Sequence, residues 1–273
     1  EGTRETTAFG SPCVQYTSRL GGVEGPEGAV VGSEDCLFLN VWAPRSAPDA
    51  VPTGSGRRPV MVWIHGGGNS IGQGGFYDGG NLAATHDLVV VTVNYRLGPL
   101  GWFRHAALRG ADTTAADRSG NFGTLDHIRA LEWVRDNIAA FGGDPGNVTI
   151  FGESAGGTNV LTLLVAPAAQ GLCHRASVQS GSPRTSDTAS AENFADATPA
   201  GDRNSSNEVL LRLLAGDRVR ADAAGVRAYL DAMNAPTIER YLRDTSAAEL
   251  LGAYETVLGS GMIDMPKIFR DGV

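Results

Sequence analysis

Residues 152–156 read Gly-Glu-Ser-Ala-Gly, which places Ser154 between two glycines where an apolar run gives way to a helical one. In a turn from strand to helix, Gly152 and Gly156 lack the Cβ atoms that would clash as the backbone bends, so the serine hydroxyl is exposed. A serine becomes a useful nucleophile only beside a base and beside donors for the oxyanion that its attack creates. Taken alone, the pattern fits a plain glycine turn equally well.

Groups suited to that oxyanion occur in two places. Ala155 offers a backbone N–H at the start of the helical run, and the sequence His-Gly-Gly-Gly at residues 65–68 follows the apolar run 60–64 as a loop of bare backbone. Both can turn N–H groups toward the serine. Two distant segments thus indicate one chemistry, acyl transfer through a covalent serine intermediate. A plain glycine turn with no catalytic role becomes the weaker interpretation.

Apolar and alternating runs predict the strands that position these residues. The connection of about 25 residues between the runs 60–64 and 88–95 favours a crossover and parallel pairing. The apolar residues of 121–141 recur every three or four positions, which predicts a helix. We therefore expect an α/β fold with a mostly parallel sheet and the serine at the carboxyl end of a strand. The predicted strands are 33–42, 60–64, 88–95, 148–152 and 176–180.

Beyond Asp187 the composition shifts toward Ala, Asp, Arg and Ser, without a strand-like run. We expect residues 1–186 to form the N-terminal part of the catalytic domain and residues 187–273 to form a helical cap or insertion, which often covers the mouth of a pocket. The helical patterns in this region lie near 207–214, 221–233 and 247–258.

Bulk composition argues against several functions. The chain has 273 residues, 42% of them hydrophobic and 19% charged, as in ordinary globular proteins. A net charge of -8 and 22 scattered Lys and Arg argue against nucleic-acid binding, which needs clustered cations. No apolar run reaches the roughly 18 residues of a membrane span, and residues 1–7 contain no hydrophobic signal core. No metal-ligand spacing occurs, and we expect no cofactor.

Three cysteines allow at most one disulfide within the chain. Cys13 and Cys36 lie at either end of a Gly-rich segment with little periodicity, which would gain roughly 3 kcal/mol from closure. We expect this pair to be bonded, which favours a secreted or extracytoplasmic location. Cys173 is expected to be a small buried hydrophobic residue rather than a reactive thiol.

Longer stretches of the chain resemble the type B carboxylesterase family, the α/β-hydrolases that include cholinesterases and many bacterial and fungal esterases and lipases. Residues 33–42, Ser-Glu-Asp-Cys-Leu-Phe-Leu-Asn-Val-Trp, are similar to the family's second signature, and residues 141–157 to its active-site signature. Residues 94–102 and 179–183 are similar to further family stretches. The resemblance extends from residue 7 to residue 183 and continues more weakly to the end. It implies an α/β-hydrolase fold.

The resemblance also implies roles for individual residues. Ser154 would form the acyl-enzyme, while Glu153 and Ser180 match positions that support the catalytic histidine from behind. An alternative for Glu153 is a carboxylate paired elsewhere in the core. The oxyanion donors would be the N–H groups of Gly67, Gly68 and Ala155.

Two features depart from the family pattern. The first concerns the loop between Cys13 and Cys36, which match a disulfide found early in the family. In cholinesterases this loop carries a tryptophan that binds the choline cation. Residues 14–35 contain no tryptophan, so a choline ester is not expected to be the preferred substrate. Asn69 replaces an aromatic residue that is common after the glycines, which leaves the shape of the pocket rim open.

The mechanism also requires a histidine base and a carboxylate that orients it, which in this fold follow the serine in the order acid, then histidine. His174 is the sole histidine after Ser154, and no Asp or Glu lies between them. His65 is expected to be structural, and the histidines at 86, 105 and 127 are not expected to act as the base. Because residues 263–272 resemble the segment just before the family's acid, we expect residues 1–273 to be a fragment. A C-terminal segment of the same enzyme, as a second chain, would complete it.

The sequence therefore predicts a serine carboxylic-ester hydrolase for small to medium uncharged esters, active when complemented by that segment. A lipase or a carbamate or amide hydrolase of the same family is an alternative within the class. A catalytically inactive binding or adhesion module is an alternative of another class, although such family members typically lose the serine that this chain keeps.

Overall fold

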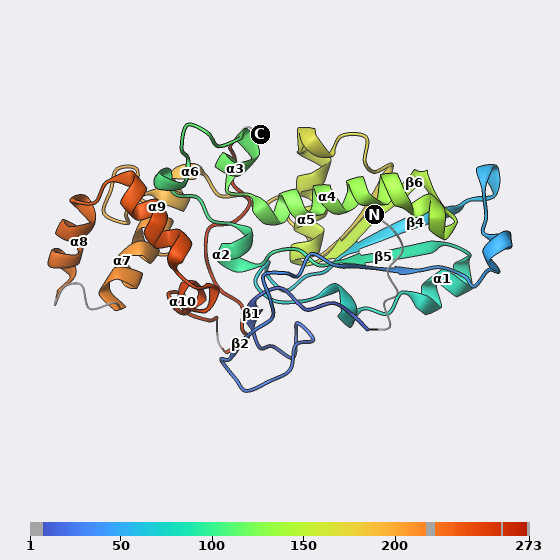
Figure 1. The fold of residues 1–273 in the computed structure, drawn as a ribbon, viewed down its shortest axis with the longest axis horizontal. Helices are drawn as coiled ribbons and strands as arrows, with labels where there is room; N and C mark the ends of the chain where they lie inside the picture. The colour runs from blue at the N-terminus through green and yellow to red at the C-terminus, as the bar shows by residue number, and fades with distance from the viewer. Residues whose placement is uncertain (1–7, 217–221, 258, 272–273) are drawn as a thin grey trace.

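The computed structural model describes residues 8–216, 222–257 and 259–271, and its centre is a five-stranded sheet (Figure 1). The strand order is β3-β5-β4-β6-β7. All neighbouring pairs are parallel except β3 with β5, so the predicted mostly parallel sheet and the predicted pairing of β4 with β5 are confirmed. The strands are β3 (Leu39–Trp42), β4 (Arg58–Ile64), β5 (Val89–Val93), β6 (Gly143–Glu153) and β7 (Arg175–Gln179).

Each face of the sheet is covered by helices whose apolar side chains match alternate strand residues. Val89 and Val91 of β5 face α4 (Phe122–Asn137) and α5 (Ala155–Val165) in the main core, whereas Val90 faces α1 (Gly80–His86) in a smaller cluster. Figure 1 shows α4 and α5 together on one side and α1 on the other. All five residues of β5 are buried, as expected of a central strand in a sheet covered on both faces.

The predicted helix 121–141 is confirmed as α4 followed by a 3-10 turn, Ile138–Phe141. Leu131 and Val134 lie fully buried in the main core, and Gly142, with φ 77°, ends the helix in the left-handed conformation that glycine tolerates. Two shorter helices, α2 (Gly98–Gly101) and α3 (Ala115–Ser119), lie in the connection before α4.

The described residues after β7 form the helices α6 (Thr188–Glu192), α7 (Ser206–Gly216), α8 (Ala223–Asp231), α9 (Ala235–Asp244) and α10 (Ala247–Gly252). Helices α7 to α10 gather at one end of the molecule (Figure 1). Helices α7 and α8 share a small core of Leu210, Leu214, Val226 and Leu230, and residues of α9 pack against it. The sequence predicted three helices after residue 187 and missed α6 and α9. Residues 221 and 258, at the ends of two predicted helices, lie outside the described residues.

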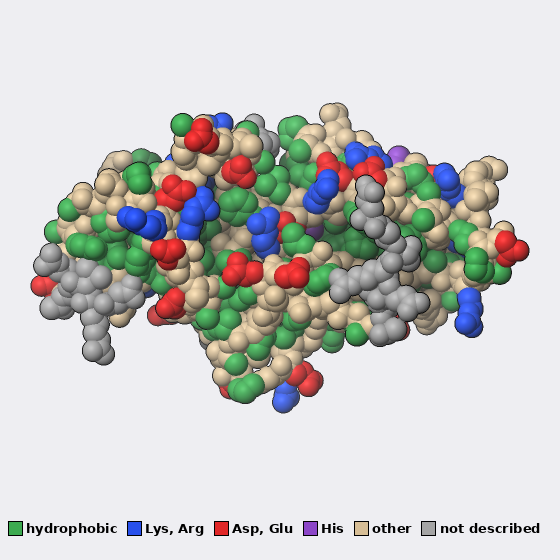
Figure 2. Space-filling view, in the orientation of Figure 1, with side chains coloured by type: hydrophobic (Ala, Val, Ile, Leu, Met, Phe, Trp, Pro, Cys, Tyr) green, Lys and Arg blue, Asp and Glu red, His purple; other side chains and the backbone are tan. Residues whose placement is uncertain are grey.

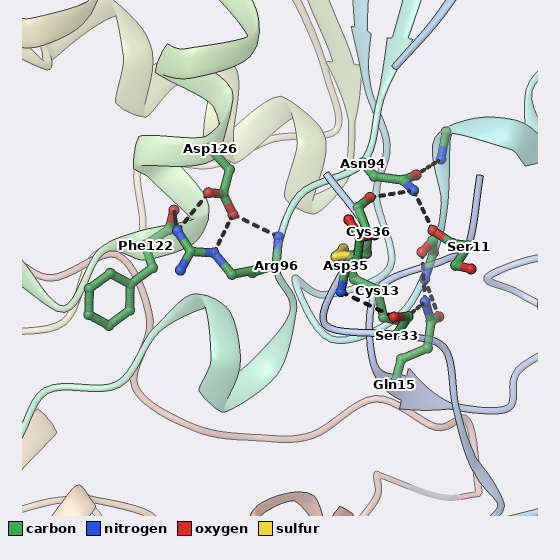
Figure 3. Close-up of a disulfide and its surroundings, with 12 residues drawn as sticks. Ser11, Cys13, Gln15, Ser33, Asp35, Cys36, Asn94, Arg96, Phe122 and Asp126 are labelled. Carbon is green, nitrogen blue, oxygen red and sulfur yellow. Dashed lines mark hydrogen bonds and ion pairs between the residues drawn. A yellow bond between two sulfur atoms is a disulfide. The ribbon is translucent and has the colours of Figure 1, made fainter. Parts of the chain in front are cut away.

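The segment before β3 is mostly irregular, as predicted, with two short antiparallel strands, β1 (Gln15–Tyr16) and β2 (Val30–Val31). The predicted disulfide between Cys13 and Cys36 is present and buried (Figure 3). The Asn94 side chain accepts from the Gly74 N–H and donates to the carbonyls of Ser11 and Cys36. Because the chain around Cys36 is held by these bonds, the strand predicted at 33–42 begins only at Leu39.

Acidic and basic side chains are interspersed across the face in Figure 2. None of the helices in the described ranges is long and apolar enough to cross a membrane.

Candidate active site

Ser154 lies at the carboxyl end of β6, at the sharp turn into α5. Its φ of 56° and ψ of -120° fall where residues other than glycine are rare, a strain that is typical of functional sites. A Cβ atom at Gly156 would clash with the carbonyl oxygen of Ile64, and one at Gly152 would lie 2.7 Å from the same oxygen. The glycines therefore allow β4 and β6 to approach at the turn, and the Ser154 side chain is exposed there.

The loop after β4 lies directly beside this turn. A Cβ atom at Gly66 would be 2.8 Å from the Glu153 carbonyl oxygen and 3.3 Å from the Ser154 Cβ atom. Gly67 and Gly68 have φ angles of 91° and 63°, which glycine alone adopts readily. Among the described residues, no acceptor binds the N–H groups of Gly67, Gly68 or Ala155. Three unpaired donors therefore lie on the two segments that meet at Ser154.

Asn69 anchors the end of this loop, is 4% exposed with a φ of 56°, and is one of the residues that line the cavity described below. Its side-chain amide pairs reciprocally with Asn159 of α5, with N–O distances of 3.2 and 2.8 Å. The Tyr95 hydroxyl, 2.7 Å from the His65 carbonyl oxygen and 3.3 Å from Asn69 Oδ1, lies under the same loop. The loop is thus bonded to the helix that begins at Ser154.

A cavity of about 760 Å³ opens above the turn. Of the predicted site residues, Gly68, Ser154, Ala155 and Ser180 line it. Ser180 directly follows β7 and has a φ of 53°. It therefore lies at the same carboxyl edge of the sheet as Ser154 and the loop after β4. The volume lies in the range of small-molecule sites.

Two predicted site residues do not line this cavity. Gly67 packs against the Ile71 carbonyl oxygen. The Glu153 carboxylate lies toward Gly66, with Oε2 3.2 Å from where a Cβ atom of that glycine would be. It also faces Tyr77, whose phenol pKa is raised by burial and, to a smaller extent, by the Glu153 charge.

None of the five histidines lines the cavity within the described ranges. His65 and His127 are buried against Tyr95, and burial lowers their pKa values to about 4 and about 3. His105 is bonded to Asn207 on α7, and the exposed His174 accepts from the Val148 N–H. A base for Ser154 is therefore absent from the described part of the cavity lining.

The cavity wall opposite the turn was not predicted. It comes from residues 182–186 and 264–270, two segments far apart in the sequence that meet through the bonds of Ser186 with Ile268 and Arg270. It includes a lysine, Lys267, for which the sequence offers no signal, because neither segment has a recognisable motif for a ligand.

Comparisons with known proteins agree with this geometry. The family model described as the carboxylesterase family matches residues 1–264. The chain is 47% identical over 189 residues to the para-nitrobenzyl esterase of Bacillus subtilis, an alignment that covers 68% of this chain and 35% of that protein. It is 52% identical over 150 residues to liver carboxylesterase 1 of Oryctolagus cuniculus, covering 55% of this chain and 24% of that protein.

Solved structures give the same result. A PNB esterase superposes with a TM-score of 0.65 at 37% identity, covering 90% of this chain and 42% of that one. A Geobacillus stearothermophilus carboxylesterase gives 0.62 at 37% identity, covering 99% and 46%. The chain thus spans less than half the length of these relatives. With a matching family model over almost its whole length and the α/β-hydrolase fold of these structures, the chain belongs to the carboxylesterase family.

Proposed function

We propose that the protein is a serine hydrolase of carboxylic esters and that Ser154 is its nucleophile. The observation that carries this proposal is the strained Ser154 turn, with three unpaired backbone N–H groups beside it and a cavity above it. The family membership and the ester-hydrolase names of the relatives support it.

In the proposed reaction, the Ser154 hydroxyl attacks the ester carbonyl carbon and gives its proton to a base. The N–H groups of Gly67, Gly68 and Ala155 stabilise the tetrahedral oxyanion, a contribution of about 3 kcal/mol for a single donor. The carbon–oxygen bond to the alcohol then breaks, and the alcohol leaves with the proton. Water attacks the acyl-serine in a second step of the same kind and releases the acid.

The base and its carboxylate would come from a segment of the same enzyme that is not among residues 1–273. Two features support this. The cavity lining within the described residues includes no histidine. The outer edge of β7 pairs with no strand in the described ranges, and all five residues of β7 are exposed, so a further strand can add there. Glu153 and Ser180 would support the incoming histidine, and residues 187–273 would form a cap.

The proposed function is tested with the complete enzyme, meaning this chain together with the segment that supplies the base. It should hydrolyse p-nitrophenyl esters, and Ser154→Ala should lower kcat at least about 10³-fold. Ser182→Ala is the matched control, because Ser182 lines the same cavity and should keep the wild-type rate. Wild-type turnover by Ser154→Ala would disprove the assignment.

The second segment is tested separately by denaturing mass spectrometry of the active material. We expect a second polypeptide or a longer chain. Full turnover by residues 1–273 alone would exclude this part of the proposal. Because disulfides persist in oxidising compartments, the Cys13–Cys36 bond supports a secreted or extracytoplasmic location.

A further inference from the structure

The cavity beside Ser154 is lined by more positive than negative side chains. Arg184, Lys267 and Arg270 contribute to its wall, and Asp264 is the one acidic residue of the lining within the described residues. This local excess is opposite in sign to the net charge of -8 of the whole chain. Side chains of one sign around a recess concentrate the field there and attract ligands of the other sign.

Partners outside the lining compensate part of this charge. Arg270 lies 3.8 Å from Asp187, and Asp264 lies 3.6 Å from Arg203. All four side chains are more than half exposed, so each pair contributes little beyond cancelling its own charge. Two cations of the lining, Lys267 and Arg184, form no ion pair with any described residue.

The Lys267 ammonium lies close to the oxyanion loop. Its Nζ donates to the Ile263 carbonyl oxygen at 2.8 Å, and the same oxygen accepts from the Ser70 hydroxyl at 3.3 Å. Ser70 directly follows Asn69, the residue that anchors the loop. Burial lowers the pKa of Lys267 to about 8, against the smaller opposite effect of Asp264, so most of the lysine is protonated at pH 7. Because the ammonium donates one of its three protons to Ile263, two protons remain for a ligand.

We propose that the preferred substrates are esters that carry an anionic group, such as a carboxylate, and that Lys267 and Arg184 bind that group. This inference rests on the proposed ester hydrolysis at Ser154 and specifies its substrate class. This class differs from the uncharged esters expected from the sequence, because a neutral ester would supply no counter-ion for Lys267 and Arg184. Lys267 is a specificity residue in this account and takes no part in bond making.

The test compares esters that differ in charge but share a leaving group class. The complete enzyme is given three acetate esters that differ on the alcohol side: the anionic 4-acetoxybenzoate, its neutral methyl ester and the cationic (4-acetoxyphenyl)trimethylammonium. Monoethyl glutarate against ethyl valerate places the charge on the acyl side. On one side or the other, kcat/KM for the anion should exceed that for the neutral ester about tenfold at low salt, and the preference should shrink as salt rises.

The variants locate the preference. Lys267→Met keeps the apolar stem and should abolish most of the preference, measured as the ratio of kcat/KM for the anionic ester to kcat/KM for the neutral ester in the same variant. Lys267→Arg should retain the preference, and Arg184→Gln should reduce it. The matched control is Arg129→Gln, which makes the same change in net charge on an exposed face of α4. It should leave the preference unchanged.

The outcomes separate the two proposals. Loss of turnover on every ester would refute the proposed function itself. Turnover of neutral esters without an anion preference on either side, or a preference that Lys267→Met and Arg184→Gln both leave intact, would overturn the substrate class alone. Circular dichroism of each variant ensures that a misfolded protein is not taken for a change in preference.

Discussion

Replacing Asn159 removes the amide that ties the oxyanion loop to the helix that begins at Ser154. Asn69 and Asn159 are 4% and 1% exposed, and their two mutual hydrogen bonds span elements that are 90 residues apart in the sequence. Asn159→Ala breaks both bonds from the helix side. Asn69→Gly breaks them from the loop side, and glycine is chosen because the φ of 56° at this position would strain alanine.

The magnitude follows from what each variant leaves unpaired. Without Asn159, the Asn69 Nδ2 group is buried with no acceptor, whereas its Oδ1 atom keeps the Tyr95 hydroxyl at 3.3 Å. One unsatisfied buried group costs about 1–3 kcal/mol. Each single variant should therefore lose about 2 kcal/mol of stability. The double variant should lose about as much as one single variant, which gives a coupling free energy of about 2 kcal/mol.

The assay is a double-mutant cycle on the complete enzyme, with urea unfolding and esterase kinetics measured on each variant. Because Gly67 and Gly68 lie on the tethered loop, kcat should fall about tenfold in each variant while KM changes little. Thr162 lies on the same helix, and its side-chain hydroxyl donates only to the Thr158 carbonyl. The loss of stability in Thr162→Val should therefore add to that in Asn69→Gly. Additive losses from the asparagine pair itself, within about 0.5 kcal/mol, would refute the tether.

Three further predictions concern stability. Replacing Cys13 and its disulfide partner by serine should lower the free energy of unfolding by about 3 kcal/mol in urea, and an unchanged midpoint would contradict this. Because burial lowers the pKa of His65 to about 4 and of His127 to about 3, below pH 6.5 the unfolded chain binds more protons than the folded one. Stability should fall from pH 6.5 to pH 4 by up to about 1.4 kcal/mol per pH unit for each histidine, and His127→Phe should flatten that slope. Asp126→Ala removes the acceptor of three Arg96 hydrogen bonds (Figure 3) and should cost about 2–3 kcal/mol, whereas a loss below about 0.5 kcal/mol would contradict the role of this pair.

The sequence predicted the sheet, the turn at Ser154 and the disulfide because each has a local signal. The apolar run at 88–95 is buried on both faces, the run at 60–64 alternates buried and half-buried residues, and the glycines at 152 and 156 are required by close backbone approach. These constraints act within a few residues, so they leave a visible pattern in the sequence.

The remaining features depend on contacts between distant segments. Helix α9 has a start signal in Asn234 and Pro236, but its partly buried residues are too few to form a clear apolar run. The Asn69–Asn159 pair and the cavity wall formed by residues 182–186 and 264–270 bring together residues that are far apart in the sequence. No periodic pattern in the sequence indicates that they are in contact. For Asn69 in particular, a polar residue after a glycine loop indicates a surface position, and its burial follows from an amide partner on another element.

Covalent labelling shows directly whether Ser154 is the nucleophile. The complete enzyme is treated with a fluorophosphonate, digested, and its peptides are measured by mass spectrometry. We expect one phosphonyl addition, on Ser154, with loss of esterase activity in proportion to labelling and no addition in Ser154→Ala. Undiminished turnover with Ser154 fully labelled, or inactivation with the addition on another residue, would contradict this assignment of the nucleophile.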